Sequence, residues 1–381
     1  MRQSLIFPFL LLCFALLPSG FAQDVTQWRV PESDAAPSDT TAINAIAFSL
    51  DGTQLAIATA NGITVSDTYT GKELALFSAP LDNVTALAFS PNNQTVASAS
   101  EDATLHLWNT RTGEHRTHFI EHTHPIVALA FSPDGNTLAS GSFREIRLWN
   151  LTTDLPIPIS VLNGHQDMVT TLAFSPDSKT LASTSFYGTV LLWDVETGQH
   201  RHNLPAHTDS ITALAFSPDN RTLASGGYWS LEADSTIHLW DIHTGHLLTT
   251  VDRHTDPVFA LAFSPNSETL ASAGWDNTMR LWHPQTGHLK GGFESDTRPV
   301  LALAFLPDNY NTLASVSLDS TIQLWSLTAA PKSSDVNADG VVNVLDLTFV
   351  ASHFGESSPD LNGDGIVNIL DLVLVAQHIG K

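Results

Sequence analysis

A short apolar motif that recurs seven times constrains the fold of this 381-residue chain more than any other feature. It reads AIAFS, ALAFS, TLAFS or ALAFL, and its Phe falls at positions 48, 89, 131, 174, 216, 263 and 305. The spacing is 41 to 47 residues, so the seven units run from Ile43 to Leu327. A fixed period of this length is typical of repeat architectures, in which each unit packs on its neighbours.

Each unit has the composition of short β-strands joined by tight turns. An apolar strand is followed by a turn such as SPDG or SPNN, a strand such as TLASGS, and a third strand such as TIHLW that ends before TG. Pro restricts φ at the second turn position, and Asp or Asn tolerates the tight bend. In TIHLW, Ile237 and Leu239 fall on one face at the period of a strand. We therefore predict an all-β repeat domain.

These units resemble the WD-repeat β-propeller family, in which four short strands form each blade. The family's Trp position is filled in six units, but the first unit has Ser66-Asp67 there and is degenerate. The resemblance implies a seven-bladed propeller over residues 23–327. It also implies that Asp24–Ser33 supplies the fourth strand that the last unit lacks, which would leave no open edge. The six Trp residues are Trp108, Trp149, Trp193, Trp240, Trp282 and Trp325, and only Trp193 and Trp240 precede an Asp.

Histidines at a fixed offset before four of the units are the next regular feature. In the family, such a His bonds to a Ser or Thr and to an Asp beside the Trp. Regularly spaced His and Asp could also serve as metal ligands or in catalysis, but one set per blade places them far apart around a ring. We therefore predict a structural network. The histidines are His122, His165, His207 and His254, and the complete sets are His207, Ser225, Asp234 and Trp240, then His254, Ser272, Asp276 and Trp282.

Aromatic residues gather in the turns between the second and third strands of the units. In a propeller these turns lie on one face, and large aromatics on a loop face are typical of interaction hot spots. We predict that this face binds a protein partner. The alternative for Phe143 and Tyr187, which stand near the position of a missing Asp, is packing against the neighbouring blade. The predicted partner-binding residues are Phe143, Phe186, Tyr187, Tyr228, Trp229 and Trp275.

Charge and motifs narrow the class of function. The formal net charge of −23 argues against binding to nucleic acid or an anionic membrane, which needs clustered Lys and Arg. The sequence has no GxSxG, HExxH or phosphate-binding Gly loop. We predict a non-enzymatic binding or scaffold protein. Two alternatives are a propeller that stacks carbohydrate on the same aromatics and a propeller hydrolase built from single loop residues such as Glu232.

The first 22 residues are expected to be a signal peptide. Arg2 is followed by the apolar run Leu5–Leu17, and small residues precede Gln23. The run is too short to span a bilayer. Cys13, the one cysteine, lies within it, and a lipid anchor on Cys13 is the alternative to cleavage. We predict a secreted protein, extracellular or associated with the cell surface.

The C-terminal segment contains two copies of one acidic loop, DVNADGVVNVLD and DLNGDGIVNILD. Oxygen donors at positions 1, 3, 5, 9 and 12, Gly at position 6 and a backbone carbonyl at position 7 form the spacing that Ca²⁺ prefers. We predict two bound Ca²⁺ ions. The ligands are Asp335, Asn337, Asp339, Val341, Asn343 and Asp346 in the first loop, and Asp360, Asn362, Asp364, Ile366, Asn368 and Asp371 in the second.

One apolar helix is expected after each loop, and such duplicated loop-helix units resemble the dockerin type I family. The resemblance covers residues 335–381, beyond a linker at 328–334, and implies a small all-α calcium-binding domain that docks on a cohesin-like module. The family often has Ser-Thr before the last ligand, whereas this chain has apolar pairs, which implies a more apolar contact or packing within the domain. These pairs are Val344 and Leu345, and Ile369 and Leu370.

Overall fold

The repeated motif folds into β-hairpins around a tight turn. In the third repeat, β10 (Ala128–Phe131) pairs antiparallel with β11 (Thr137–Gly141). The Ser132 hydroxyl donates to the Asp134 carboxylate at 2.5 Å, and Gly135 adopts a left-handed φ of +75°, which Gly accepts without steric cost. The same Ser-to-Asp or Ser-to-Asn bond occurs between Ser49 and Asp51, Ser90 and Asn92, Ser175 and Asp177, Ser217 and Asp219, and Ser264 and Asn266.

The computed structural model describes residues 25–29, 43–59, 62–77, 83–153, 156–205, 207, 210–227, 235–294, 298–306, 312–319, 321–327 and 350–351. The strands in this part of the chain are β1 (Val25–Arg29), β2 (Ala45–Phe48), β3 (Gln54–Thr59), β4 (Gly62–Asp67), β5 (Glu73–Phe77), β6 (Val84–Phe89), β7 (Thr95–Ser100), β8 (Thr104–Asn109), β9 (His115–Ile120), β10, β11, β12 (Phe143–Asn150), β13 (Ile157–Phe174), β14 (Thr180–Ser185), β15 (Thr189–Asp194), β16 (His200–Pro205), β17 (Ile211–Phe216), β18 (Thr222–Gly227), β19 (Ile237–Asp241), β20 (Leu247–Val251), β21 (Val258–Phe263), β22 (Leu270–Gly274), β23 (Thr278–Trp282), β24 (Leu289–Glu294), β25 (Val300–Phe305), β26 (Thr312–Ser317) and β27 (Thr321–Ser326).

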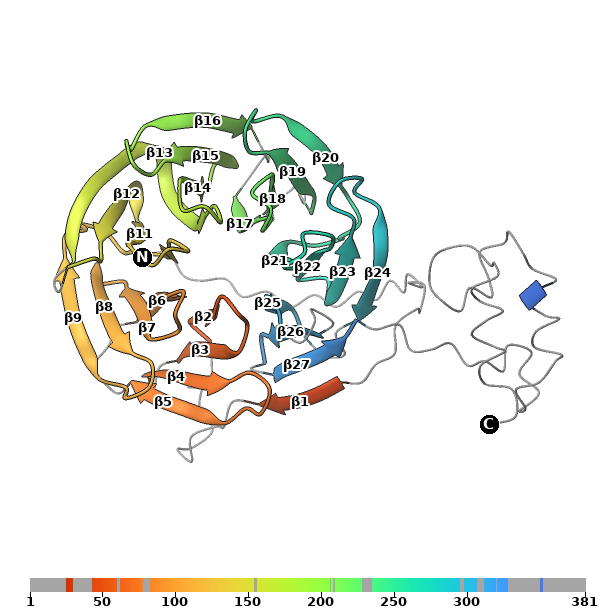
Figure 1. Ribbon diagram of the computed structural model, residues 1–381, viewed down its shortest axis with the longest axis horizontal. Helices are drawn as coiled ribbons and strands as arrows, with labels where there is room; N and C mark the ends of the chain where they lie inside the picture. Colours follow the sequence, from red (N-terminus) through yellow and green to blue (C-terminus); the bar gives the residue numbers. More distant parts are fainter. Residues whose placement is uncertain are drawn as a thin grey trace, which may run out of the picture.

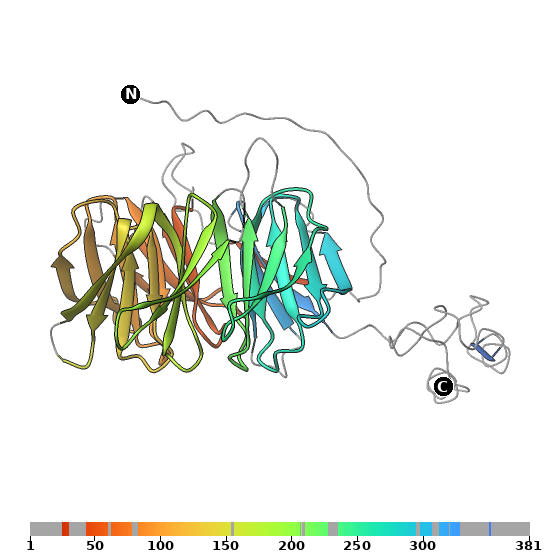
Figure 2. The ribbon, with the colours of Figure 1, turned by 90° about the horizontal axis from the view of Figure 1, so that it is seen from above.

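These strands form a ring of antiparallel sheets. Among the described residues there are six sheets, five of four strands and one of seven. The innermost strands contact one another in the order β2, β6, β10, β13, β17, β21 and β25, and β25 contacts β2. The chain therefore forms a closed propeller (Figure 1), whose sheets stand side by side when the ring is viewed edge-on (Figure 2).

The long strand β13 explains why hydrogen bonding gives six sheets, whereas the repeats predict seven separate ones. β13 has 18 residues. Its first part pairs with β12, from Ile157 opposite Asn150 to Asn163 opposite Glu145, and its last part pairs with β14. The chain thus passes from the outer edge of one four-stranded set to the inner edge of the next without leaving the strand conformation. Between β20 and β21 the equivalent link is a loop.

The two ends of the repeat region meet in one sheet. β1 pairs antiparallel with β27, from Val25 opposite Trp325 to Arg29 opposite Thr321. This sheet has the order β1-β27-β26-β25, and Figure 1 shows β1 beside β27 on the outer side of the ring. Backbone hydrogen bonds between the first and last strands therefore hold the ring closed.

Neighbouring sheets pack through one Trp and one small residue per repeat. Trp108 on β8 stacks on Phe77 on β5 of the preceding sheet, with ring centroids 5.3 Å apart. At the equivalent positions, Phe119 contacts Trp149 and Phe293 contacts Trp325, while Leu162, Leu204 and Val251 share core clusters with Trp193, Trp240 and Trp282. The second strand of each repeat carries a fully buried Ala, which lets the sheets approach closely. These are Ala56, Ala97, Ala139, Ala182, Ala224, Ala271 and Ala314.

Several predicted features lie outside the described residues. They are the signal peptide, the linker, Tyr228, Trp229, Asp234, Glu232 and the segment 335–381 with its calcium ligands and its two apolar pairs, apart from Val350 and Ala351. In the described part of the chain, no helix is long and apolar enough to cross a membrane.

Candidate protein-binding face

The two ends of the ring carry different kinds of connection. At one end, which we call the loop face, lie the links from each outer strand to the next inner strand and the turns between second and third strands. Backbone bonds join these two kinds of connection, as when the Trp275 N–H donates to the Pro257 carbonyl at 2.9 Å and the Leu318 N–H donates to Pro299 at 2.9 Å. The opposite end, the turn face, carries the Ser-Asp turns and the turns between third and outer strands.

A buried hydrogen-bond network lies beneath the loop face. The indole N–H of each repeat Trp donates to a Ser hydroxyl on the second strand, at 2.8 to 3.1 Å. Imidazole Nε2 atoms bond to the same hydroxyls at 2.6 to 3.1 Å. The predicted structural network is therefore confirmed for these contacts. The His–Ser–Trp sets are His122, Ser140 and Trp149; His165, Ser183 and Trp193; His207, Ser225 and Trp240; and His254, Ser272 and Trp282.

The sixth repeat contains the complete network. His254 Nδ1 lies 2.8 Å from Asp276 Oδ2, and Thr278 donates its hydroxyl to the same carboxylate at 2.8 Å. Burial acts to raise the pKa of Asp276, but the hydrogen bond and charge of His254 and the bonds from Thr278 outweigh it, so the pKa is lowered. Asp276 is therefore held as a carboxylate in the protein interior.

The third repeat fills the Asp position in a way that the sequence analysis missed. Glu145 Oε1 lies 2.7 Å from His122 Nδ1 and 3.2 Å from Arg147 Nε. Burial lowers the pKa of His122, and the Glu145 hydrogen bond opposes this shift. The turn before Glu145 is short and contains Arg144 at a left-handed φ of 67°, so the carboxylate arrives two residues later than expected. The sequence signal that could have predicted this contact is a carboxylate, Glu145, two residues after the expected Asp position at Phe143.

The fourth repeat has no acidic residue in this role. His165 bonds to Ser183 through Nε2 at 2.6 Å, but its buried Nδ1 has no hydrogen-bond partner among the described residues. Burial, together with the nearby His200, lowers the pKa of His165 to about 4. Tyr187 occupies the Asp position and is 63% exposed, so it does not take the place of the missing carboxylate by packing inward.

Large apolar side chains are exposed in the turns between second and third strands. Phe186 and Trp275 are each 48% exposed, and Trp275 contacts the ring of Phe259 with centroids 5.7 Å apart. Leu318, in the last repeat, is 40% exposed and, as an aliphatic residue, lacks the aromatic signal that marks the other turns in the sequence. Each of the three stands seven residues before its repeat Trp, so the fold brings them to equivalent places on the loop face.

Phe143 differs from the other predicted aromatics. Its side chain is half-buried, with the His124 ring at 5.2 Å between centroids and the Arg144 guanidinium 4.9 Å from the ring centroid. The cation lies over the π face, which is an attractive arrangement. Phe143 therefore packs within its own loops more than Phe186 and Tyr187 do.

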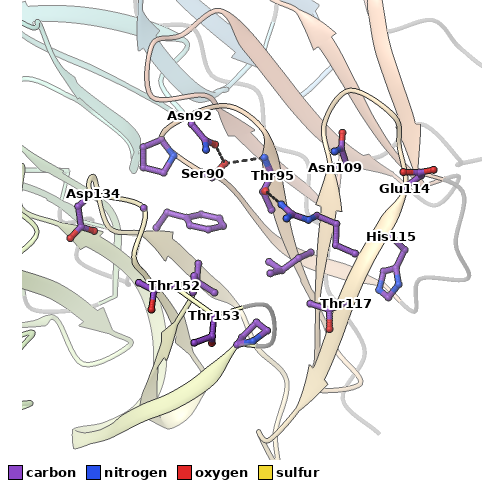
Figure 3. Close-up of a pocket in the computed structure, with 17 residues that line it drawn as sticks. Ser90, Asn92, Thr95, Asn109, Glu114, His115, Thr117, Asp134, Thr152 and Thr153 are labelled. Carbon is purple, nitrogen blue, oxygen red and sulfur yellow. Dashed lines mark hydrogen bonds between the residues drawn. The ribbon is translucent and has the colours of Figure 1, made fainter.

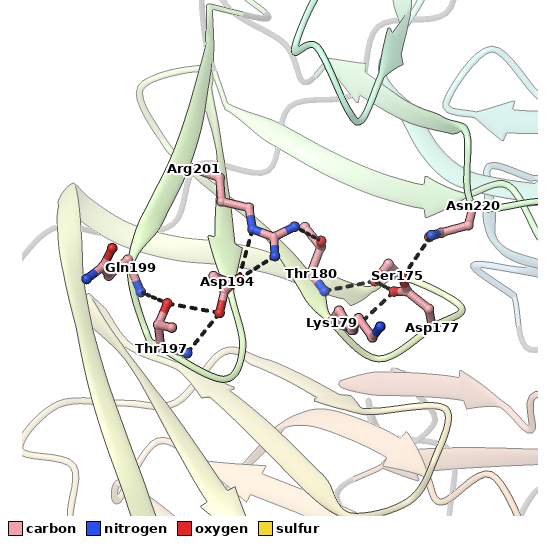
Figure 4. Close-up of polar contacts among 9 residues, drawn as sticks. All are labelled: Ser175, Asp177, Lys179, Thr180, Asp194, Thr197, Gln199, Arg201 and Asn220. Atoms are coloured by element: carbon pink, nitrogen blue, oxygen red, sulfur yellow. Dashed lines mark hydrogen bonds and ion pairs between the residues drawn. The ribbon is translucent and has the colours of Figure 1, made fainter.

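Polar contacts organise the turn face (Figure 4). Arg201 on β16 pairs with Asp194 at the end of β15 and donates to the Thr180 hydroxyl at 3.1 Å. The Thr197 N–H and Arg201 hold the pKa of Asp194 at about 2. Turns of neighbouring sheets are also joined, because the Asn220 side-chain amide donates to Asp177 at 3.0 Å. The bond between Asn220 and Asp177 therefore connects two successive sheets of the ring.

No metal centre is evident in the part of the chain that the structure describes, where no group of three or more His, Cys, Asp or Glu side chains could hold an ion. The two His–carboxylate pairs there, His122 with Glu145 and His254 with Asp276, belong to the repeat network. In contrast, the predicted calcium ligands lie in the segment 335–381, outside the described residues.

Comparison with known families agrees with this architecture. The sequence model of the WD domain, G-beta repeat, matches residues 71–109, 113–150, 156–194, 198–241, 245–283 and 286–326. All six segments begin within the connection before an outer strand, and each ends at or next to the end of the third strand of the following repeat, as expected when repeats interlock. No curated protein matches the chain. Repeats of this kind suggest a protein-interaction scaffold, and proteins with them are typically non-enzymatic. The matched segments cover more than half of the sequence, and the chain belongs to the WD40-repeat family.

Proposed function

We propose that this protein is a non-enzymatic binding scaffold whose loop face holds a protein partner. The observation that carries this proposal is the exposure of large apolar side chains at equivalent positions of several repeats. Phe186, Trp275 and Leu318 are 40 to 48% exposed at equivalent positions of one face, and Tyr187, next to Phe186, is 63% exposed. Grouped apolar side chains on a rigid scaffold are typical of interaction sites.

The propeller in this proposal has seven blades. Support comes from β13, which pairs with two different strands along its length and so serves as the outer strand of one set and the inner strand of the next. The seven-stranded sheet counts as two four-stranded blades that share β13. Together with the five four-stranded sheets, one of which contains β1, it gives seven blades. The unit formed by β2–β4 carries the degenerate Ser66-Asp67 and lies outside the six matched segments.

The tail and the N-terminal leader complete the proposal. The duplicated loops that begin at Asp335 and Asp360 would each bind one Ca²⁺ ion, and the dockerin-like segment would attach the secreted propeller to a cohesin-like module of an extracellular assembly. The support is the identical spacing of oxygen donors in both loops. Sequencing the N-terminus of the exported protein checks the leader, since cleavage after Ala22 leaves Gln23 as the first residue.

A matched pair of variants tests the loop face. Phe186→Ala/Tyr187→Ala removes two exposed side chains from that face, and Leu247→Ala/Leu248→Ala removes two that are 47 and 50% exposed on the outer strand β20. Proteins captured from the producer's extracellular fraction by the full chain are identified, and their affinity is measured for each variant. We expect the first variant to weaken binding by about tenfold or more and the second to leave it unchanged. Equal affinity for both variants would contradict the proposed surface.

Calcium titration of the full chain tests the tail separately. The expected result is two binding events by calorimetry, one of them lost in Asp346→Ala and the other in Asp371→Ala. The capture experiment is repeated with chelator. A partner lost with chelator but retained by Phe186→Ala/Tyr187→Ala belongs to the tail, and a partner with the opposite behaviour belongs to the propeller. Absence of calcium binding by the full chain would remove the tail from the proposal.

A further inference from the structure

A cavity opens on the turn face between the sheets β6–β9 and β10–β13. Its volume is about 720 Å³, whereas the cavity beside Arg201, between the sheets of β16 and β17–β20, has about 310 Å³. The larger volume is within the usual range of small-molecule sites. Figure 3 shows polar side chains from both sheets around this opening, including Asn92, Thr117 and Asp134. It lies on the end of the ring opposite the loop face, so it is independent of the proposed protein-binding surface.

The cavity lies where the repeat pattern breaks. Five turns between third and outer strands contain a Gly with φ between +67° and +72°, whose N–H bonds back across the turn at 2.8 to 3.0 Å. The turn between β12 and β13 has no such Gly. Instead, the Asn150 side chain accepts bonds from the N–H and hydroxyl of Thr152, at 2.8 and 2.7 Å. Thr152, Thr153 and Pro156 of this turn line the cavity. The five glycines are Gly71, Gly113, Gly198, Gly245 and Gly287.

A second difference concerns the arginine in each cavity. Arg201 pairs with Asp194 and bonds to Thr180. Arg116 makes the equivalent bond to the Thr95 hydroxyl at 2.8 Å, but the residue that corresponds to Asp194 is Asn109. The Asn109 side-chain oxygen stabilises the turn by accepting hydrogen bonds from the N–H groups of Arg111 and Thr112. Among the described residues no carboxylate pairs with Arg116, so its guanidinium lines the larger cavity with donors that are not held in an ion pair.

The remaining lining combines hydrogen-bonding groups of both kinds with an apolar wall. Glu114 and Asp134 supply acceptors, Asn92 and Thr117 supply mixed groups, and Phe131 contributes an aromatic ring. His115 adds an imidazole whose Nε2 lies 3.0 Å from His106 Nδ1. Burial and the nearby His118 lower the pKa of His115, which favours its neutral form. Charges of both signs line the cavity, which disfavours a ligand with one strong charge.

We propose that this cavity binds a neutral polyhydroxylated ligand, a mono- or disaccharide. Vicinal hydroxyl groups donate to the carboxylates and accept from Arg116 and the amides, while the C–H face of a sugar ring packs against Phe131. Internal bonds already hold many of the lining groups, such as Asn92 with Ser90 at 2.8 Å, so little side-chain entropy is lost on binding.

The test uses the full chain and four neutral disaccharides, cellobiose, xylobiose, mannobiose and lactose, with glucuronate as a charged comparison. Binding is measured by ligand-observed NMR and calorimetry. Asn109→Asp gives Arg116 the carboxylate partner that Arg201 has, and Asp194→Asn makes the reverse change in the smaller cavity. We expect at least one neutral disaccharide to bind, Asn109→Asp to weaken it by about tenfold or more, and Asp194→Asn to leave it unchanged. Unchanged thermal unfolding shows that Asn109→Asp still folds.

Three results would overturn the proposal. The first is that no neutral disaccharide binds at millimolar concentration. The second is that glucuronate binds and the neutral sugars do not, which would assign the cavity to anions. The third is that a sugar binds with equal affinity to wild type and Asn109→Asp, which would place its site elsewhere on the molecule.

Discussion

The fourth and sixth repeats share one buried scaffold but use the turn above it differently. In the sixth repeat, Asp276 accepts from His254 and closes the hydrogen-bond network. In the fourth repeat, Tyr187 holds the same position and points into solvent, while His165 Nδ1 is left without a partner among the described residues. The Trp–Ser bond is 2.8 Å in both. The Trp and Ser therefore fix the strand packing of each repeat, whereas the Asp position tolerates an exposed side chain.

The largest effect is expected from acid. The pKa of His165 is 6.5 in the unfolded chain and about 4 in the folded protein. Below pH 6.5 His165 binds a proton in the unfolded chain, whereas in the folded protein it binds one only near pH 4. Lowering the pH through this window therefore reduces the free energy of unfolding by about 3 kcal/mol from His165 alone. Above pH 6.5 this contribution is constant. Urea unfolding at a series of pH values measures this change in the free energy of unfolding. Trp fluorescence is a suitable signal because every Trp of the chain lies within the repeat region or the N-terminal strand and none lies in the C-terminal segment.

Removal of the closing carboxylate in the sixth repeat is expected to have the next largest effect. Asp276→Ala removes the carboxylate that pairs with the buried His254 Nδ1, leaving only the Thr278 hydroxyl at 3.4 Å, and should lower the free energy of unfolding by about 2 kcal/mol. Urea unfolding at pH 7.5 measures the change, with Asp252→Ala as the exposed acidic control. A loss of stability equal to that of the control would show that the Asp is dispensable even where it is present.

Introducing a carboxylate at the Asp position of the fourth repeat is the reverse experiment. Tyr187→Asp provides His165 Nδ1 with an acceptor and should raise the free energy of unfolding by about 1 kcal/mol at neutral pH. It should also raise the pKa of His165 and so reduce the loss of stability between pH 6.5 and 4. Tyr187→Asn serves as the uncharged control. A steeper acid dependence in Tyr187→Asp than in wild type would contradict this assignment.

The smallest effect on stability is expected at the exposed aromatics. Phe186→Ala should change the free energy of unfolding by no more than about 0.5 kcal/mol, because the side chain is 48% exposed. Urea unfolding measures this change beside that of Phe77→Ala, which removes a fully buried ring that packs on Trp108 and should be far more destabilising. A large loss of stability in Phe186→Ala would indicate a packing role and would weaken the case for partner binding.

Features that recur in every repeat can be predicted from the sequence, whereas features that occur in a single repeat cannot. Period, turn chemistry and the Trp position identify the strands and the His–Ser–Trp network, because each unit repeats the same signals. The substitution of Glu145 for Asp depends on a shortened turn with Arg144 at positive φ, which composition does not reveal. The continuity of β13 depends on backbone pairing through a segment that reads as a loop in other repeats.

The candidate surfaces were partly predictable for the same reason. Aromatic residues in the turns mark the loop face, but their exposure depends on tertiary packing, which separates half-buried Phe143 from exposed Tyr187. Leu318 aligns with Trp275 by its spacing from the repeat Trp, but its exposure on the face depends on tertiary packing. The turn-face cavity is lined by residues of an unusual turn and by Asn109, and neither feature predicts a cavity from the sequence by itself.

Hydrogen–deuterium exchange of the full chain, alone and bound to its captured partner, tests the central claim most directly. We expect slower exchange in the turns that contain Phe186, Tyr187 and Trp275, and unchanged exchange in the Ser-Asp turns of the opposite face. Protection confined to the turn face, or to the outer strands such as β20, would contradict the claim.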